Sequence, residues 1–117
     1  MLAADDVVSM IRAAGGLVEA REFDLADPDT LPKIFDWVEA VFGPVDVLVN
    51  YAAHYEHADS IFDTTVNGLD RTCSINMQAA VMLTAEYVRC YERYNSKTER
   101  VTNLSTDAAQ TFAGQIA

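Results

Sequence analysis

The sequence predicts an α/β domain built on a parallel sheet, and two observations carry this prediction. The chain of 117 residues alternates amphipathic helical segments with short apolar segments, in the order helix, strand, helix, strand, helix, strand. Alternation of this kind is typical of right-handed crossovers between parallel strands. The second observation is the apolar run V-D-V-L-V-N at residues 45–50. A strand that helices cover on both faces is apolar on both sides, so we expect this run inside the sheet.

Length and composition limit the classes of protein that the chain can represent. Its size allows a single domain, and with 50% hydrophobic and 22% charged residues it has the profile of a folded globular protein. The formal net charge is -10 at pH 7. Because excess negative charge repels phosphate backbones and anionic lipids, nucleic acid and membrane surfaces are not expected partners.

The two cysteines and the start of the chain predict neither a metal site nor a membrane segment. Cys73 and Cys90 fall in one predicted helix, without metal-ligand spacing to His54 or His57, so we expect both thiols to be buried or half-buried packing groups. No apolar run is long enough to span a bilayer, and Met1 is followed by acidic residues rather than by a signal segment. The cytoplasm is therefore the expected compartment.

The first two elements are a helix and an edge strand. Residues 3–14 place their apolar side chains on one face at helical spacing, which predicts an amphipathic helix packed on another element. A pair of glycines, Gly15 and Gly16, ends this helix. Residues 17–25 follow as a strand whose alternation is broken by three charged residues, and such polarity suits the edge of a sheet.

The remaining elements lead to a second strand tip. An apolar stripe predicts a helix over residues 31–42, which a Gly-Pro pair ends before the strand at 45–50. The long polar connection at 54–68 is typical of functional loops. Over residues 69–94 the apolar side chains wrap most of a helical cylinder, which implies burial against the sheet and against a second surface such as another subunit. Residues 100–105 form the last strand and end in hydroxyl groups.

A site is expected where these strands end. Ligands of open α/β sheets bind in the crevice outside the carboxyl ends of the strands, where Asn50 and the small Ala52 and Ala53 follow residues 45–50. If the last strand lies parallel beside this one, Ser105 opens into the same crevice. The simpler alternative for Asn50 is a polar residue that ends a buried strand.

Two segments resemble the nucleotide-binding part of the short-chain dehydrogenase/reductase family. Asp24 and Leu25 resemble the position of the family's Asp that contacts the adenine ring. Residues 46–53, D-V-L-V-N-Y-A-A, resemble the family segment D-x-L-V-N-N-A-G, with Tyr51 in place of the second Asn and Ala53 in place of Gly. Asp24 could equally cap the turn that follows it.

Two further segments resemble the family's catalytic part. Residues 74–80, S-I-N-M-Q-A-A, resemble the long-helix segment whose Asn, here Asn76, supports a proton-relay water. Residues 100–106 resemble the strand that ends at the catalytic Ser, which falls on Ser105, with Thr106 as the alternative. The other interpretation of Asn76 is a structural hydrogen bond. His54 and His57 either line a substrate pocket or are solvated loop residues.

The resemblance implies a fold, a cofactor and a reaction. The fold is an incomplete Rossmann-like doubly wound parallel sheet, with residues 1–117 forming one partial nucleotide-binding domain. The cofactor is NAD or NADP, held by Asp24, Leu25, Asn50 and Ala52. The reaction is hydride transfer between a nicotinamide and a carbonyl or alcohol substrate, with Ser105 and Asn76 as catalytic residues. The long helix at 69–94 would carry a homo-oligomer interface.

The resemblance also leaves two family motifs without a counterpart. The Gly-rich turn would precede residue 1 and Tyr-x-x-x-Lys would follow residue 117, and no Tyr in this chain has a Lys four positions later. We therefore expect a segment of an oxidoreductase, inactive as this chain alone and with doubtful cofactor binding. Because the family's two intervening strands are missing, the sheet would be rearranged, completed by strand exchange, or part of a longer chain.

Two other functional classes stay open at this stage. A small acidic binding or signalling module of flavodoxin-like or receiver-like type has the same size and charge but no redox activity. A receiver would need a carboxylate cluster and a Lys at its strand tips, and neither is visible in the sequence. The third class is an assembly partner that acts only through its long helix.

Overall fold

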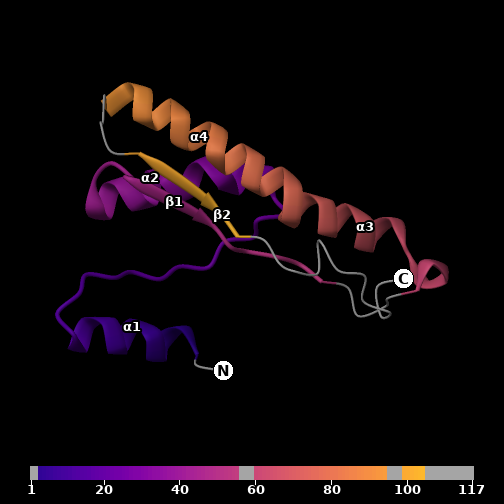
Figure 1. Cartoon of the computed structure of the whole chain (residues 1–117), viewed down its shortest axis with the longest axis horizontal. Helices are drawn as coiled ribbons and strands as arrows, with labels where there is room; N and C mark the ends of the chain where they lie inside the picture. Colours follow the sequence, from indigo (N-terminus) through magenta and orange to yellow (C-terminus); the bar gives the residue numbers. More distant parts are fainter. Residues whose placement is uncertain (1–2, 56–59, 95–98, 105–117) are drawn as a thin grey trace.

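The computed structural model describes residues 3–55, 60–94 and 99–104, and it has the predicted α/β architecture (Figure 1). Its long helices are α1 (Ala4–Ala13), α2 (Leu31–Phe42), α3 (Val66–Cys73) and α4 (Ala79–Tyr94). The strands are β1 (Val47–Asn50) and β2 (Arg100–Asn103). Short helical turns are η1 (Pro28–Thr30), η2 (Ile61–Asp63) and the π-helical segment η3 (Ser74–Gln78).

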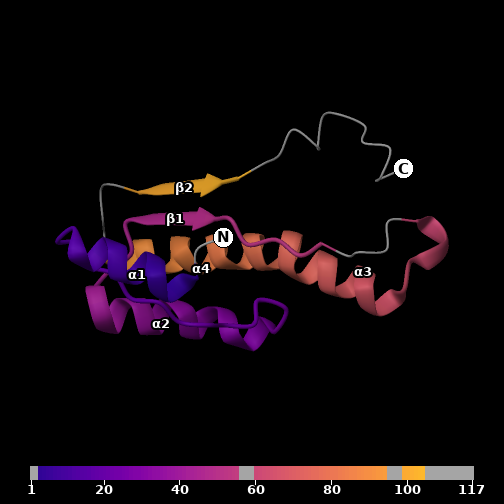
Figure 2. The ribbon, with the colours of Figure 1, turned by 90° about the horizontal axis from the view of Figure 1, so that it is seen from below.

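The two strands are parallel neighbours, as the sequence predicts. Val47 lies opposite Arg100 and Asn50 lies opposite Asn103, so both strands reach their carboxyl ends at the same level. Viewed from below, β1 and β2 form one layer, and α2 and α4 lie together on one side of it (Figure 2). The strand tips therefore meet at one edge of the sheet.

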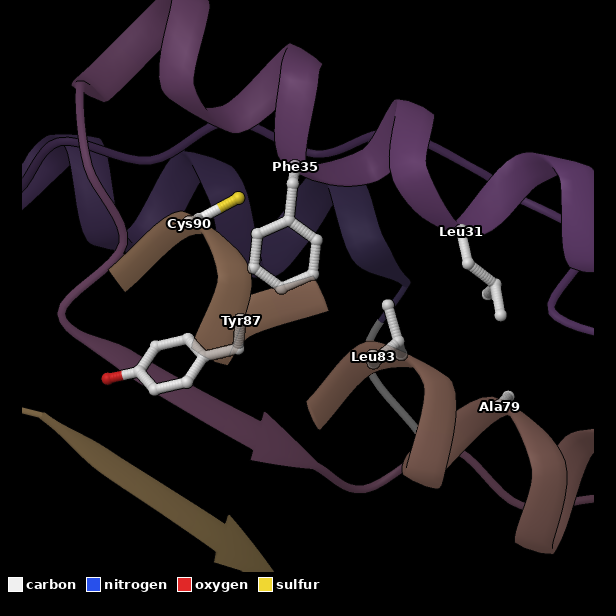
Figure 3. Close-up of a cluster of buried hydrophobic side chains, with 6 residues drawn as sticks. All are labelled: Leu31, Phe35, Ala79, Leu83, Tyr87 and Cys90. Atoms are coloured by element: carbon white, nitrogen blue, oxygen red, sulfur yellow. The ribbon is translucent and has the colours of Figure 1, made fainter. Parts of the chain in front are cut away.

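A small core joins α2 to α4. Its six buried residues come from these two helices alone, at spacings of three or four along each helix (Figure 3). They are Leu31, Phe35, Ala79, Leu83, Tyr87 and Cys90. Partly buried side chains of Leu25, Ile34, Val45 and Leu48 pack against them and connect the core to β1. The predicted apolar stripe of residues 31–42 is thus confirmed at Leu31 and Phe35.

The hydroxyl of Tyr87 links α4 to the start of both strands. It donates to the backbone carbonyl of Asp46, at 2.5 Å, and accepts from the backbone N–H of Arg100, at 3.1 Å. The same N–H of Arg100 also lies 3.2 Å from the carbonyl oxygen of Asp46. A buried phenol needs a partner for its hydroxyl, and here the partners are the two chain segments that enter the sheet. Tyr87 therefore fixes the strands to each other and to the helix.

The long helix begins three residues earlier than predicted. The Thr65 side chain accepts from the backbone N–H of Gly68, at 3.0 Å, and this cap starts α3 at Val66 rather than at Leu69. The helical chain then continues through η3 and α4 to Tyr94. No helix in the described ranges combines the length and hydropathy that a bilayer span requires.

One face of the long helix is buried and the opposite face is not. The expected second surface is absent from the described part of this chain, since Met77, Val81, Met82 and Val88 are all exposed. The prediction for the cysteines is confirmed at Cys90 and wrong at Cys73, which is exposed because α3 buries none of its residues. Burial, together with the neighbouring carboxylate of Glu39, raises the pKa of the Cys90 thiol to about 11.

The sheet is covered on one face only within the described residues. Val47 and Val49 are 51% and 54% exposed, and Val101 of β2 is also partly open to solvent. The expectation that helices cover both faces of residues 45–50 is therefore wrong for this part of the chain. The apolar run of residues 45–50 therefore includes side chains, those of Val47 and Val49, on a face of the sheet that no described element covers.

The predicted edge strand at residues 17–25 is also wrong. Residues 16–24 run extended without strand pairing, and Leu17 is 89% exposed. An extended segment becomes a strand only when a neighbour accepts its backbone hydrogen bonds, and no described strand lies beside it. Phe23 instead packs on Trp37 of α2, with ring centroids 5.8 Å apart.

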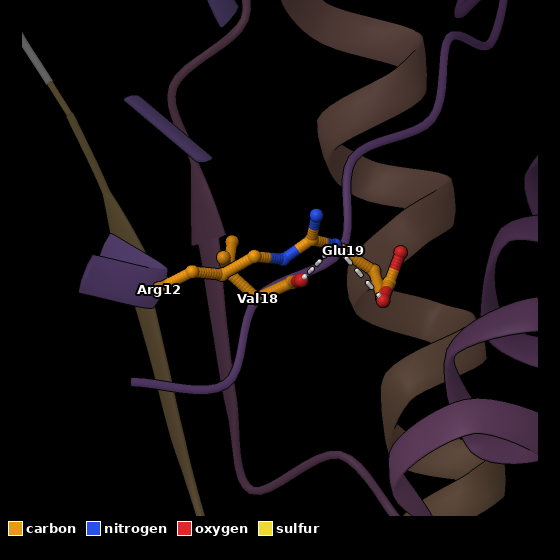
Figure 4. Close-up of polar contacts among 3 residues, drawn as sticks. All are labelled: Arg12, Val18 and Glu19. Carbon is orange, nitrogen blue, oxygen red and sulfur yellow. Dashed lines mark hydrogen bonds and ion pairs between the residues drawn. The ribbon is translucent and has the colours of Figure 1, made fainter. Parts of the chain in front are cut away.

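The first helix forms as predicted but does not pack. None of the residues of α1 is buried, and in Figure 1 the helix lies apart from the other elements. The Arg12 guanidinium holds the turn after it, donating to the carbonyl of Val18 at 3.1 Å and to the Glu19 carboxylate at 3.2 Å (Figure 4). The apolar face of α1 is therefore not buried against any described element.

Replacing Tyr87 by Phe tests the role of its hydroxyl. We expect Tyr87→Phe to lower the free energy of unfolding by about 1–2 kcal/mol, because the carbonyl of Asp46 and the N–H of Arg100 each lose one part-buried hydrogen bond of the two that they make. Urea unfolding measures this change. As a control, Tyr51→Phe removes an exposed hydroxyl and should change the free energy by less than about 0.5 kcal/mol. Equal effects of the two substitutions would show that the hydroxyl does not join the strands.

Candidate functional site

A groove of about 810 Å³ opens at the carboxyl ends of β1 and β2, against one side of the long helix. It therefore lies where open α/β sheets bind their ligands. The strand tips form one wall and the helical chain from η3 into α4 forms the other. The lining residues are Asn50, Tyr51, Ala52, Ala53, Asn76, Met77, Ala80, Val81, Thr84, Asn103 and Leu104.

Asn50 joins the two strand tips to the helix. Its side-chain N–H groups donate to the Oδ1 atom of Asn103, at 2.8 Å, and to the hydroxyl of Thr84, at 3.4 Å. The Thr84 hydroxyl donates in turn to the backbone carbonyl of Ala80, at 2.8 Å. Asn50 thus does more than end a strand, because it connects β1, β2 and α4 at one point of the groove.

Asn76 holds the loop that follows β1. Its Oδ1 atom accepts from the backbone N–H of His54, at 2.6 Å, and its Nδ2 atom donates to the carbonyl of the same residue, at 2.9 Å. The residue lies within η3, and π-helical turns inside α-helices occur frequently at functional sites. Both ends of the amide are engaged by the backbone of one residue, His54, so the side chain fixes the path of the loop beside the groove.

Among the described residues, none that lines the groove has a charged side chain. Its lining residues are amides, a hydroxyl, a phenol and apolar groups, although the chain as a whole has a formal net charge of -10. Within the described ranges, no three His, Cys, Asp or Glu side chains lie close enough together to hold a metal ion. The groove therefore suits an uncharged ligand group that makes apolar contacts and a few hydrogen bonds.

The structure brings three of the predicted site residues together and leaves two outside. Asn50, Ala52 and Asn76 all line the groove. Asp24 does not, because its Oδ1 atom accepts from the backbone N–H of Ala26, at 3.0 Å, which is the turn-capping alternative. Leu25 packs against the core instead. Both therefore lie outside the lining of the groove.

The last predicted site residue and its alternative, Ser105 and Thr106, lie outside the described residues. The residue before them, Leu104, lines the groove, and its backbone N–H donates to the carbonyl of Asn50 at 3.1 Å. The parallel pairing thus extends to the last described residue of this segment.

Sequence reasoning missed two polar residues of the groove, Thr84 and Asn103. A signal for Thr84 exists, because Asn76, Ala80 and Thr84 recur every four residues and so share one face of a helix. The signal for Asn103 is weaker. It depends on the register of the sheet, which pairs this residue with Asn50 and which the sequence of one strand does not specify.

Comparison with known proteins gives consistent matches over most of the chain. A protein-family model described as "Enoyl-(Acyl carrier protein) reductase" matches residues 2–116. The chain is 28% identical, over 90% of its length, to the short chain dehydrogenase/reductase dpchG of Colletotrichum higginsianum. It is 31% identical, over 83% of its length, to the short chain dehydrogenase/reductase dpmpG of Macrophomina phaseolina. It spans 39% and 55% of these two relatives.

A solved structure shows the same arrangement of elements. A short chain dehydrogenase from Burkholderia cenocepacia, crystallised in complex with NADP, is 28% identical and superposes with a TM-score of 0.82. The match covers 94% of this chain and 43% of that protein. The fold class predicted from the sequence is therefore confirmed, as an α/β fold of the Rossmann type with a small parallel sheet.

Removing the Asn76 side chain tests its hold on the loop. We expect Asn76→Ala to speed hydrogen exchange of the His54 backbone N–H by about tenfold, because a hydrogen bond contributes on the order of 1 kcal/mol. Exchange is measured by NMR on the labelled chain. The control is Asn67→Ala, which removes an exposed amide from the same long helix. Unchanged exchange at His54 in the Asn76 variant would contradict this role.

Proposed function

This chain belongs to the short-chain dehydrogenase/reductase family, and on that premise we propose that it forms part of the site of an NAD(P)-dependent oxidoreductase acting on a carbonyl or alcohol. One observation carries the proposal. Asn50, Ala52 and Asn76 converge on a groove at the carboxyl ends of two adjacent parallel strands, the usual ligand position in such sheets. We treat residues 1–117 as part of one nucleotide-binding domain.

The groove fits the uncharged part of a dinucleotide better than its pyrophosphate. Ala52 has only a methyl group to keep a ligand from the backbone, and Asn50 and Thr84 offer polar atoms among apolar neighbours. Pyrophosphate binding in this fold uses a Gly-rich turn at a helix N-terminus, and the glycines at 15, 16, 43, 68 and 114 form no such turn. We therefore assign to the groove a ribose or a nicotinamide ring of NAD or NADP.

Asp24 and Leu25, which lie outside the groove, are proposed to contact another part of the cofactor. Asp24 and Leu25 lie at the turn before η1, where the carboxylate of Asp24 is 4.0 Å from the guanidinium of Arg71 in α3. If they contact the adenine ring, as the family resemblance implies, the ligand extends from the groove toward this turn.

The chain's residues have distinct proposed roles in the reaction. The nicotinamide cofactor, when bound, supplies or accepts the hydride. We propose that Asn76 positions the loop after β1, through which it supports a proton-relay water. Ser105 is proposed to hold the substrate oxygen by a hydrogen bond. A family Tyr and Lys would supply the proton, so we expect no turnover by this chain alone.

The other classes of function have less support. The family membership does not favour a flavodoxin-like or receiver-like module. A role purely in assembly would not account for the groove that Asn50, Thr84 and Asn103 line at the strand tips. A cytoplasmic location stays a prediction of the sequence.

Titration with NADPH and NADH tests the proposed cofactor site. At millimolar concentrations we expect the side-chain amide resonances of Asn50, Asn76 and Asn103 to shift in NMR spectra, because all three line the groove. The dissociation constant should be on the order of 1 mM, since only neutral groups contact the ligand. The internal reference is Asn67 of α3, which lies outside the groove. Shifts at Asn67 alone, or none at all, would count against a dinucleotide in this groove.

We also propose that the chain forms a homo-oligomer through the helix at 69–94. The support is the exposed apolar side chains of Met82 and Val88, which lie outside the lining of the groove, since exposed apolar surface of this kind commonly marks an interface.

A charged side chain at Met82 or at Val88 should disrupt this interface. We expect Met82→Asp and Val88→Asp each to reduce the mass measured by light scattering to that of one chain, because a buried carboxylate without a partner is costly. Arg93→Asp, which adds negative charge at an exposed position of the same helix, should leave the mass of the oligomer unchanged. A single-chain mass for the unaltered protein, or an oligomer that survives both substitutions, would contradict the proposal.

A further inference from the structure

Tyr51 presents its ring to solvent at the groove. It is the first residue after β1 and lines the groove, yet its side chain is 76% exposed. Among the described residues, no hydrogen bond or ring contact engages it. An exposed aromatic side chain beside a ligand groove leaves a large apolar surface that a flat ligand group can cover.

The neighbours of Tyr51 leave space over its ring. The next two residues are Ala52 and Ala53, and their methyl side chains are too small to cover the ring. Asn50, on the other side, is fixed by Asn103 and Thr84, so the backbone that carries Tyr51 is anchored at the strand tip. The ring is thus attached to a defined point of the groove, although its own faces are open. The family segment has an Asn at this position, so an aromatic ring is a particular feature of this chain.

We propose that Tyr51 stacks on a flat heterocyclic ring of the dinucleotide and thereby sets the affinity of the groove for that ring. This inference rests on the proposed function, because it takes an NAD(P) molecule as the ligand. Two rings of the dinucleotide have the required shape, the nicotinamide and the adenine, and the nicotinamide is the one that the proposed function assigns to this groove. Stacking uses the face of the Tyr51 ring and does not need its hydroxyl group.

Three variants separate stacking from other effects. Tyr51→Ala removes the ring, and Tyr51→Phe keeps the ring but removes the hydroxyl. Phe62→Ala is the matched control, because Phe62 is 93% exposed and lies outside the groove. Since both aromatic side chains are exposed, all three variants should fold, which the dispersion of their NMR spectra verifies.

The experiment compares NADPH binding by the four proteins in NMR titrations. We expect Tyr51→Ala to weaken binding by about 3- to 10-fold, the range that corresponds to one aromatic stacking contact. Tyr51→Phe and Phe62→Ala should bind within about 2-fold of the unaltered chain. Ring-proton resonances of Tyr51 should also move on binding, as a stacked ring requires.

Two shorter ligands identify the ring. Reduced nicotinamide mononucleotide carries only the nicotinamide, and ADP carries only the adenine. The ligand whose binding is weakened in Tyr51→Ala contains the ring that stacks.

The outcomes distinguish this inference from the proposed function. If Tyr51→Ala binds NADPH as well as the unaltered chain does, stacking is wrong although the cofactor site stands. If Tyr51→Phe loses as much affinity as Tyr51→Ala, the hydroxyl rather than the ring face binds, and stacking is again wrong. If the unaltered chain binds none of the three ligands, both the cofactor site and the stacking contact are overturned.

Discussion

The hydroxyl group of Tyr87 is the contact on which the rest of this structure depends. Two short parallel strands have few hydrogen bonds of their own, and their side chains are half exposed. Tyr87 holds the entrance of β1 at Asp46 and the entrance of β2 at Arg100 from within the buried core. Because both strands start at the same anchor and run in the same direction, their carboxyl ends also meet. The position of the groove follows from that alignment.

The groove is fixed at its other end by amide side chains rather than by charges. Asn50 ties the strand tips to α4, and Asn76 ties the following loop to η3. A side-chain amide has two N–H donors and an acceptor oxygen. Asn50 therefore donates to two partners, and Asn76 both donates and accepts, without introducing a charge. This chemistry keeps the lining neutral in an acidic protein. The hydrogen-bonded polar residues of the groove, Asn50, Asn76, Thr84 and Asn103, come from the four elements β1, η3, α4 and β2.

Local sequence patterns predicted the elements that bury a face and failed where a neighbour decides the outcome. The stripe around Leu31 and Phe35, and the parallel pairing of residues 45–50 with the last strand, follow from periodicity and chain order. Asn50 and Ala52 were placed at the site because they stand at a strand end, and Asn76 because its segment resembles the long helix of the family; all three line the groove. The supposed strand at 17–25 has suitable residues but no partner, which no local pattern can reveal. Predicting Asn103 as a residue of the groove would have required the register of the sheet, which pairs it with Asn50.

The bare side of β1 has a consequence for the behaviour of the chain in solution. Within the described residues, its edge away from β2 has no pairing strand, and the residues along it are V-L-V-N. Unprotected apolar edges of this kind act as templates on which further chains add backbone to backbone, which is the start of fibrillar aggregation. Asp46 stands just before this edge, and a charge at such a position opposes stacking because it would bring like charges together.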